Sequence, residues 1–267
     1  MRATTNRRTS ASSIETDLSL SQLQAELARI DLLIHRQVKL WQLAGQDPAD
    51  TFRGLYISDT EANLLLARPF SGHWGQTAML APEEDRAFAE AEAQATGLTR
   101  SLVEMAQSQE QTLRLTHLAA AFGLDRFELD TLLVCLAPTL DLRYERLYGY
   151  LQDDVTRKRP SVNLVLNLLG PPGPERLPLL SYFAPTAPLF NYQLLERKAE
   201  TGAPLLGQTL AVDEAIVTWL LGNYQPHADL GTQAALLWPQ PDAAVTGLLA
   251  ARWPSLERAV SDLAIIV

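Results

Sequence analysis

The sequence predicts a mainly α-helical (α+β) protein, and three patterns support this fold class. Two apolar stripes with heptad spacing, in residues 18–43 and 82–108, predict a pair of long helices. Short apolar helices crowd residues 109–169, and two apolar runs after them predict a small β hairpin. Alternating apolar segments in residues 213–267 predict the beginning of an α/β module.

The composition is that of an acidic globular protein with a single thiol. The 267 residues carry a net charge of -9, which disfavours nucleic acid as a partner because an acidic surface repels phosphate. Cys135 is the single cysteine, so a disulfide within the chain is excluded. It lies in an apolar run, which suits a buried thiol in a reducing cytoplasm. No apolar stretch approaches the roughly 20 residues that cross a bilayer, so we expect no membrane association.

The first long helix is predicted for residues 18–43. Ser19 and Gln22 have the spacing of a capping box at its start. Residues 1–17, which carry arginine and hydroxyl side chains without an apolar face, are predicted to be a disordered tail. The apolar stripe of the helix consists of Leu20, Leu23, Leu27, Ile30, Ile34 and Trp41, with Gln37 as a polar interruption.

The second long helix begins at Pro82, a residue that suits the first turn of a helix. Gly97 weakens this helix by about 1 kcal/mol relative to alanine. The two helices predict an antiparallel hairpin with a long loop over residues 18–108, and their stripes either pack on the core or bind a partner as a coiled coil. The second stripe consists of Phe88, Ala91, Ala95, Leu98, Leu102 and Met105.

A long aromatic loop is predicted between the two helices. Residues 48–81 show no sustained period, and a loop of this length inside a domain is either functional or partly structured. Its aromatic side chains predict a packed loop and, with a tryptophan from the first helix, a possible partner-binding surface. The candidate partner-binding residues are Trp41, Phe52, Tyr56, Phe70 and Trp74.

Residues 109–212 predict a winged-helix-like domain. Short helices joined by tight turns are the layout of helix-turn-helix relatives, and the hairpin after them is the candidate wing. Pro138 is expected to end the second of these helices. The expected elements are helices near 113–122, 125–138, 142–151 and 162–169, a proline-rich loop at 170–190, and a hairpin of two runs at 189–195 and 205–212.

Residues 213–267 predict a linker helix followed by the opening of an α/β nucleotide-type module. Asp213 caps the helix, which Gly222 closes. The segments near 234–238 and 263–267 are expected to be strands, and residues 246–253 a helix between them. The chain stops inside its last apolar run, which we interpret as a truncated module.

The sequence contains no complete catalytic, cofactor-binding or metal site. Residues 170–176 lack the lysine and hydroxyl of a phosphate-binding loop, and their prolines lack the N–H groups of a phosphate cradle. The four histidines have no zinc-ligand spacing with one another or with Cys135. Asp153 and Asp154 are interpreted as solvated acids bonded to the basic residues 157–159. We therefore predict no enzymatic activity for this chain.

One part of the sequence resembles a known family. Residues 122–130, 136–141 and 144–162 are similar to the winged-helix domain that precedes the ATPase modules in a bacterial AAA family. Members of that family are often encoded with extracellular contractile injection systems. Residues 204–210 and 219–222 resemble the linker of the same proteins.

This resemblance implies a non-catalytic N-terminal region that recruits a protein partner or substrate and organises ATPase subunits, with a homo-oligomeric ring as the expected assembly of the parent protein. ATP and Mg²⁺ would then bind modules beyond residue 267. A DNA-binding winged-helix regulator is the alternative, although the third helix mixes Arg143 and Arg146 with acids and the wing offers only Arg197 and Lys198. An unrecognised enzyme is a third alternative.

Overall fold

The chain divides into two units between Leu220 and Leu221. In the second unit the described residues form one antiparallel pair of short strands, β3 (Leu236–Leu237) and β4 (Ile265–Ile266). Both strands lie inside predicted ones, while the helix predicted between them and residues 1–16 of the predicted tail lie outside the described residues. The computed structural model describes residues 17–44, 62–63, 66–67, 78–171, 173–198, 202–223, 236–237 and 265–266.

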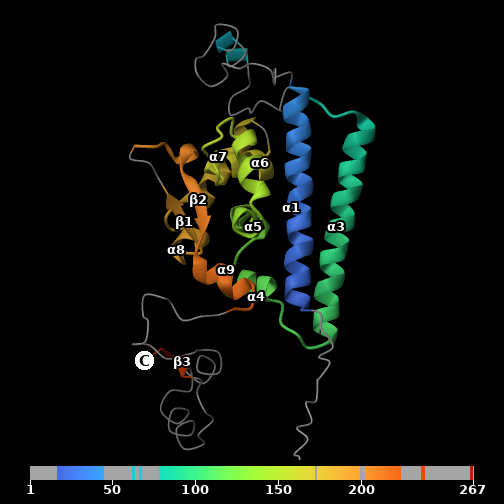
Figure 1. Cartoon of the computed structure of the whole chain (residues 1–267), viewed down its shortest axis with the longest axis vertical. Coiled ribbons are helices and arrows are strands. Elements are labelled where there is room, and N and C mark those ends of the chain that lie inside the picture. The colour runs from blue at the N-terminus through green and yellow to red at the C-terminus, as the bar shows by residue number, and fades with distance from the viewer. Residues whose placement is uncertain are drawn as a thin grey trace, which may run out of the picture. The chain divides into compact units, whose positions relative to one another are not determined.

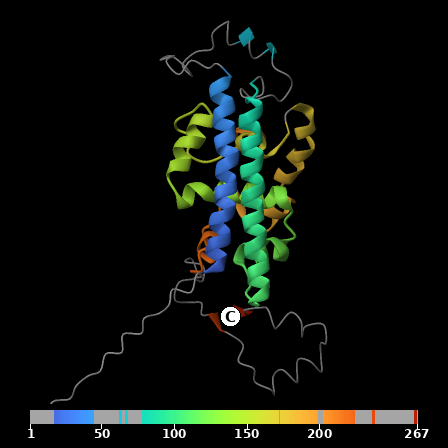
Figure 2. The same cartoon turned by 90° about the vertical axis from the view of Figure 1, so that its right-hand side faces the viewer.

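The first unit is built around helix α1 (Leu18–Leu43). Figure 1 shows α1 between α3 (Pro82–Ser108) and the short helices of this unit, and Figure 2 shows α1 and α3 side by side along their length. At one end Leu18 packs with Ala106, and at the other Lys39 Nζ lies 3.6 Å from Glu84 Oε1. The two helices are therefore antiparallel, which confirms the predicted hairpin.

The start of α1 is capped by Asp17. Its carboxylate accepts hydrogen bonds from the backbone N–H groups of Ser19 and Leu20 at 2.9 and 3.3 Å. The predicted capping box of Ser19 and Gln22 is wrong, because the Ser19 hydroxyl instead accepts from the Arg114 N–H at 3.1 Å. Gln22 Nε2 donates to Thr116 Oγ1 at 2.7 Å, so both side chains join α1 to the body of the unit.

The stripe of α3 that faces α1 differs from the predicted one in its second half. Burial follows Ala95, Thr99 and Ala106, whereas the predicted seam residues Leu98 and Met105 are 55% and 45% exposed. A straight helix drifts by about 20° per heptad from a strict seven-residue repeat, so the contact line moves one residue along the chain. The half-buried face of α3 consequently leaves two large apolar side chains in water.

Four short helices form the body, and their apolar faces make one core with α1. The buried side chains of Leu23, Ile30 and Ile34 from α1 belong to the same cluster as Leu133 and Leu164. The hairpin expected at 18–108 thus shares its core with the part expected as a separate domain. These helices are α4 (Arg114–Phe122), α5 (Arg126–Leu140), α6 (Arg143–Leu151) and α7 (Val162–Leu169).

Helix α5 runs through Pro138, where the sequence predicted its end. A proline has no N–H to donate to the carbonyl four residues earlier, which here belongs to Val134. The Tyr148 hydroxyl, fully buried on α6, donates to this carbonyl at 2.8 Å and replaces the missing donor. A distant side chain therefore allows α5 to continue to Leu140.

Replacing Tyr148 by phenylalanine should reveal this compensation. We expect Tyr148→Phe to lower the free energy of unfolding by about 1–3 kcal/mol, because the buried Val134 carbonyl loses its donor. Urea unfolding followed by circular dichroism measures the change. The matched control is Tyr150→Phe on the same helix, whose side chain is partly exposed and should change stability by less than about 0.5 kcal/mol.

The same loss should shrink in a Pro138→Ala background, because the alanine N–H can then donate to the Val134 carbonyl. An equal effect of Tyr148→Phe in both backgrounds would show that the hydroxyl does not serve as the missing donor.

Candidate functional site

The wing is a β hairpin, and residues 160–161 extend its sheet by a single bridge to β2. Strands β1 (Leu195–Lys198) and β2 (Thr209–Val212) pair antiparallel, with Leu195 opposite Val212. Ser161 bridges to Thr209, and the Leu210 N–H donates to the Pro160 carbonyl at 2.8 Å. The first strand begins later than predicted, because Pro188 opens a helical turn in the earlier half of that apolar run.

Short helical turns fill the chain between α7 and the wing. We call residues 173–194 the prewing segment; most of it was expected to be a loop. Its backbone forms two 3-10 helices and one short α-helix, each starting at or next to a proline or glycine. These elements are η2 (Gly173–Arg176), η3 (Pro178–Phe183) and α8 (Pro188–Asn191).

Two basic side chains, one in the prewing segment and one in the wing, point into the fold, whereas Lys198 of the wing is exposed. Arg176 is buried and donates to the Asn163 carbonyl at 3.4 Å, and burial lowers its pKa. Arg197 donates to the Phe183 carbonyl at 3.1 Å and lies over the Phe190 ring. Of the two wing cations, Arg197 and Lys198, the first is therefore engaged by the protein itself.

Arg143, Arg157 and Lys158 are paired with acids, whereas the exposed Arg146 and Lys198 have no ion pair among the described residues. Arg143 binds Asp31 and Asp141, and Lys158 Nζ lies 3.3 Å from Glu145. Arg157 pairs with Asp154 at 3.3 Å, which confirms the interpretation of that acid as part of a surface ion pair. Hydrogen bonds from Thr156, together with this arginine, lower the pKa of Asp154. The positive charge of these three residues is thus partly neutralised by neighbouring carboxylates.

The helices, the bridged strand at Ser161 and the hairpin form the arrangement expected of a winged helix. The sequence matches the family described as winged helix domain, variant, over residues 18–232. The chain belongs to this family. The match includes α1 and α3, so the hairpin lies within the winged-helix unit that the family describes. No curated protein and no solved structure matches the chain.

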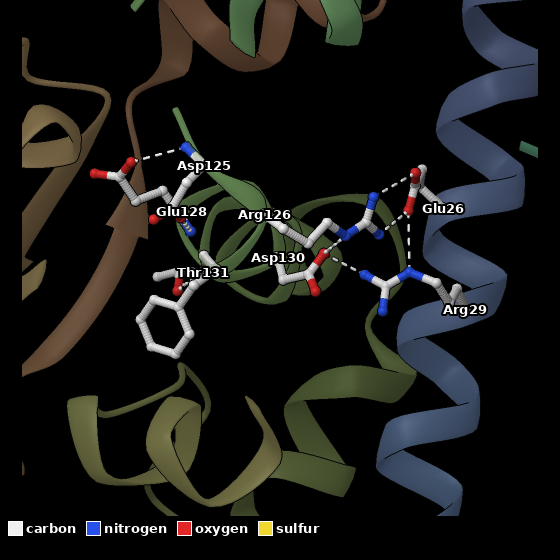
Figure 3. A network of polar contacts seen from close by, with 8 residues as sticks. Glu26, Arg29, Asp125, Arg126, Glu128, Asp130 and Thr131 are labelled. Carbon is white, nitrogen blue, oxygen red and sulfur yellow. Dashed lines mark hydrogen bonds and ion pairs between the residues drawn. The ribbon is translucent and has the colours of Figure 1, made fainter. Parts of the chain in front are cut away.

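An ionic ring joins α1 to α5 in this winged-helix unit, and Figure 3 shows its four side chains facing one another. Glu26, Arg29 and Asp130 are buried, whereas the Arg126 side chain is half-exposed. Arg126 holds both oxygens of Glu26, at 3.0 and 2.6 Å. Arg29 Nε lies 3.1 Å from Glu26, and its other end contacts Asp130. Arg126 Nε closes the ring at 3.0 Å from Asp130. Two cations and two anions therefore balance at the helix interface.

Burial and neighbouring charge act differently on the two acids of the ionic ring. Burial raises the pKa of Asp130, even though Arg29 and Arg126 favour its charged form. Burial also disfavours the charged form of Glu26, but the hydrogen bonds and charges of Arg126 and Arg29 outweigh it and lower the pKa. The two arginines therefore favour the charged form of both acids, against the burial that opposes it.

Two further polar contacts hold α1 on either side of the ionic ring. Arg114 Nη2 on α4 lies 2.8 Å from Asp17, before the start of α1. The Tyr144 hydroxyl on α6 donates to Asp31 at 2.6 Å, and burial together with this bond raises its pKa to about 12. Each body helix from α4 to α6 therefore has a polar contact with α1 or its cap.

Of the five predicted partner-binding residues, only Trp41 lies among the residues that the structure describes. Trp41 is only 4% exposed and packs against Tyr150 at 6.3 Å between ring centroids, so it is a core residue instead of a surface contact. This corrects its assignment, which followed from its position beside the aromatic loop. Phe52, Tyr56, Phe70 and Trp74 lie outside the described residues, and their role stays a prediction.

The described residues form no recognisable site for a metal. Among them, no group of three or more His, Cys, Asp or Glu side chains is close enough to hold an ion.

The glycine-rich segment is a connection between helices: Gly170 ends α7, and Gly173, with φ at 80°, begins η2. Burial raises the pKa of the Cys135 thiol far above its usual range. In the described part of the chain, no helix is long and apolar enough to cross a membrane.

Removing Arg29 tests the ionic ring. We expect Arg29→Ala to lower the free energy of unfolding by about 3–5 kcal/mol, because the buried Glu26 and Asp130 would lose the buried arginine and keep only the half-exposed Arg126. The matched control is Arg36→Ala on the same helix, whose exposed pair with Asp85 contributes less than about 1 kcal/mol. Equal losses in urea unfolding of the two variants would rule out a special role for the ring.

Proposed function

We propose that this chain is the non-catalytic N-terminal region of a AAA-family ATPase associated with contractile injection systems, and that it recruits a protein partner or substrate. The observation that carries the recruitment part is the composition of the prewing segment. It stands before the wing, where a helix-turn-helix protein places its recognition helix. Its only charged residues are Glu175 and the buried Arg176, so it suits a protein surface better than a phosphate backbone.

The exposed side chains of the prewing segment support protein contact. Leu177 is 45% exposed and Tyr192 is 52% exposed, and aromatic residues are enriched in protein interfaces. Prolines fix their own φ angles, so a proline-rich surface loses less conformational freedom when it binds. The prolines of this segment are Pro174, Pro178, Pro185 and Pro188.

The similarity of residues 122–162 and of the linker residues 204–210 to AAA proteins supports the ATPase context. In this proposal ATP and Mg²⁺ bind modules beyond residue 267, and those modules are themselves a partner of this chain. The parent protein acts in the cytoplasm as a homo-oligomeric ring. A DNA-binding regulator has less support, because Arg143, Arg176 and Arg197 are engaged within the fold.

Substitutions on the prewing segment test the recruitment surface. We expect Leu177→Glu combined with Tyr192→Ser to weaken partner binding by at least about tenfold, because a few apolar and aromatic anchors dominate interface energies. Titration against purified components of a contractile injection system measures the affinity. The control is Val155→Glu, in an exposed turn after α6. Equal binding by both variants, or binding of no component, would contradict the proposal.

Nucleotide binding is tested with the 267-residue chain itself. We expect about 1 mM MgATP to leave its melting temperature unchanged, because a ligand raises stability only when the folded chain binds it. A clear rise, or ATP hydrolysis by this chain, would contradict the non-catalytic role.

DNA binding is the competing outcome. We expect duplex DNA to bind weakly or not at all in a gel-shift assay at low salt. Tight binding that falls steeply with salt concentration would favour the regulator instead.

A further inference from the structure

Helix α3 has one long face turned away from α1, which we call the outer face. Figure 2 views the unit from the side of α3. The steps between the outer-face residues alternate between four and three, which keeps them on one line of the helix. All of them are exposed except Gly97, which is half-buried. They are Arg86, Glu90, Ala93, Gly97, Arg100 and Glu104.

The charges of the outer face have no partner in the part of the chain that the structure describes. The side chains of Arg86, Glu90, Arg100 and Glu104 make no hydrogen bond or ion pair there. The opposite face of the same helix behaves differently, since Glu84 pairs with α1 at 3.6 Å. The outer face thus carries four charges of alternating sign that no described residue neutralises.

Among the described residues, nothing explains a glycine at position 97. Its φ is negative, and a Cβ built on it meets none of their atoms within 4 Å. Glycine in a helix interior is less stable than alanine, but the missing side chain leaves room for the close approach of another backbone. Ala93, one turn away on the same line, is also small. The centre of the outer face therefore admits the backbone of a second helix.

The order of these residues is complementary to itself when reversed. In an antiparallel pair of α3 helices with a two-fold axis at the level of residue 95, Arg86 meets Glu104 of the second copy and Glu90 meets its Arg100. Ala93 meets Gly97 of the second copy at the centre, where small residues let helices approach closely. We propose that the outer face of α3 is a homodimer contact, formed by an antiparallel, two-fold pair of α3 helices.

The contact is weak by its size. Residues 86–104 span about 27 Å of helix, which is short of the area that stable complexes bury. Its ion pairs lie at the surface and are screened by salt. The dimer should therefore form at high protein concentration and dissociate as salt rises.

This inference goes beyond the proposed function, because it uses neither the prewing segment nor any ATPase module. Loss of the α3 contact would leave partner recruitment intact, and loss of recruitment would leave self-association intact. The two proposals fail separately.

Charge reversal tests the pairing. By analytical ultracentrifugation at about 100 µM and low salt, we expect the chain to show a species of twice its 29.5 kDa mass. Arg100→Glu and Glu90→Arg should each weaken dimerisation by at least about tenfold, because each two-fold contact then contains two like-charge pairs. The double variant should regain wild-type affinity within about threefold, since both pairs are restored with reversed sign.

The control is Glu92→Arg, which makes the same change of charge on an exposed residue of α3 away from the outer face and should leave dimerisation unchanged. Gly97→Leu should abolish the dimer without destabilising the chain, because its side chain enters open space in the monomer. A wild-type chain that stays monomeric, or a double variant that fails to recover, would overturn the proposal.

Crosslinking separates antiparallel from parallel pairing. Cys135 is buried, so engineered thiols should react alone. A mixture of Ala93→Cys and Gly97→Cys chains should form a disulfide between the two variants under oxidation, whereas Ala93→Cys alone should not crosslink. Efficient crosslinking of Ala93→Cys with itself would indicate a parallel contact and overturn the antiparallel arrangement.

Discussion

The first unit depends on the packing of α1 between α3 on one side and the short helices on the other. The ionic ring determines the position of α1 along α5. Apolar stripes tolerate sliding, because leucine packs nearly as well one turn away. The ring does not, since a shift of one turn, about 5.4 Å, would separate Glu26 and Arg29 from Arg126 and Asp130. Breaking a buried ion pair is strongly destabilising. The ring therefore aligns α1 with α5, and through α1 it also determines where α3 lies.

Apolar periodicity was sufficient to predict α1, α3 and the short helices of the body, because helix formation and a buried stripe are local properties. Contacts between distant residues account for the errors. Arg114 takes the Ser19 hydroxyl that was expected to cap α1, and Tyr148 supplies the donor that lets α5 pass Pro138. In each case a partner far along the chain overrides a correct local rule.

The candidate site was less predictable than the fold. Trp41 belongs to the same stripe as Ile34, and that stripe, more than the neighbouring aromatic loop, determined its burial. The ionic ring went unnoticed because each half resembles an ordinary surface pair on its own helix. In the prewing segment the prolines correctly indicated an interrupted backbone, but the short helices between them depend on burial of side chains such as Phe183 and Leu189.

The sharing of α1 between two packing layers sets the smallest fragment of this protein that can fold. A fragment that starts at residue 109 contains the body helices α4 to α7 and both strands of the wing, yet it lacks Ile30 and Ile34 from the core. It also leaves Asp130 with Arg126 alone. Deletion experiments that remove the hairpin would therefore report unfolding, and a shortened chain should begin no later than Asp17.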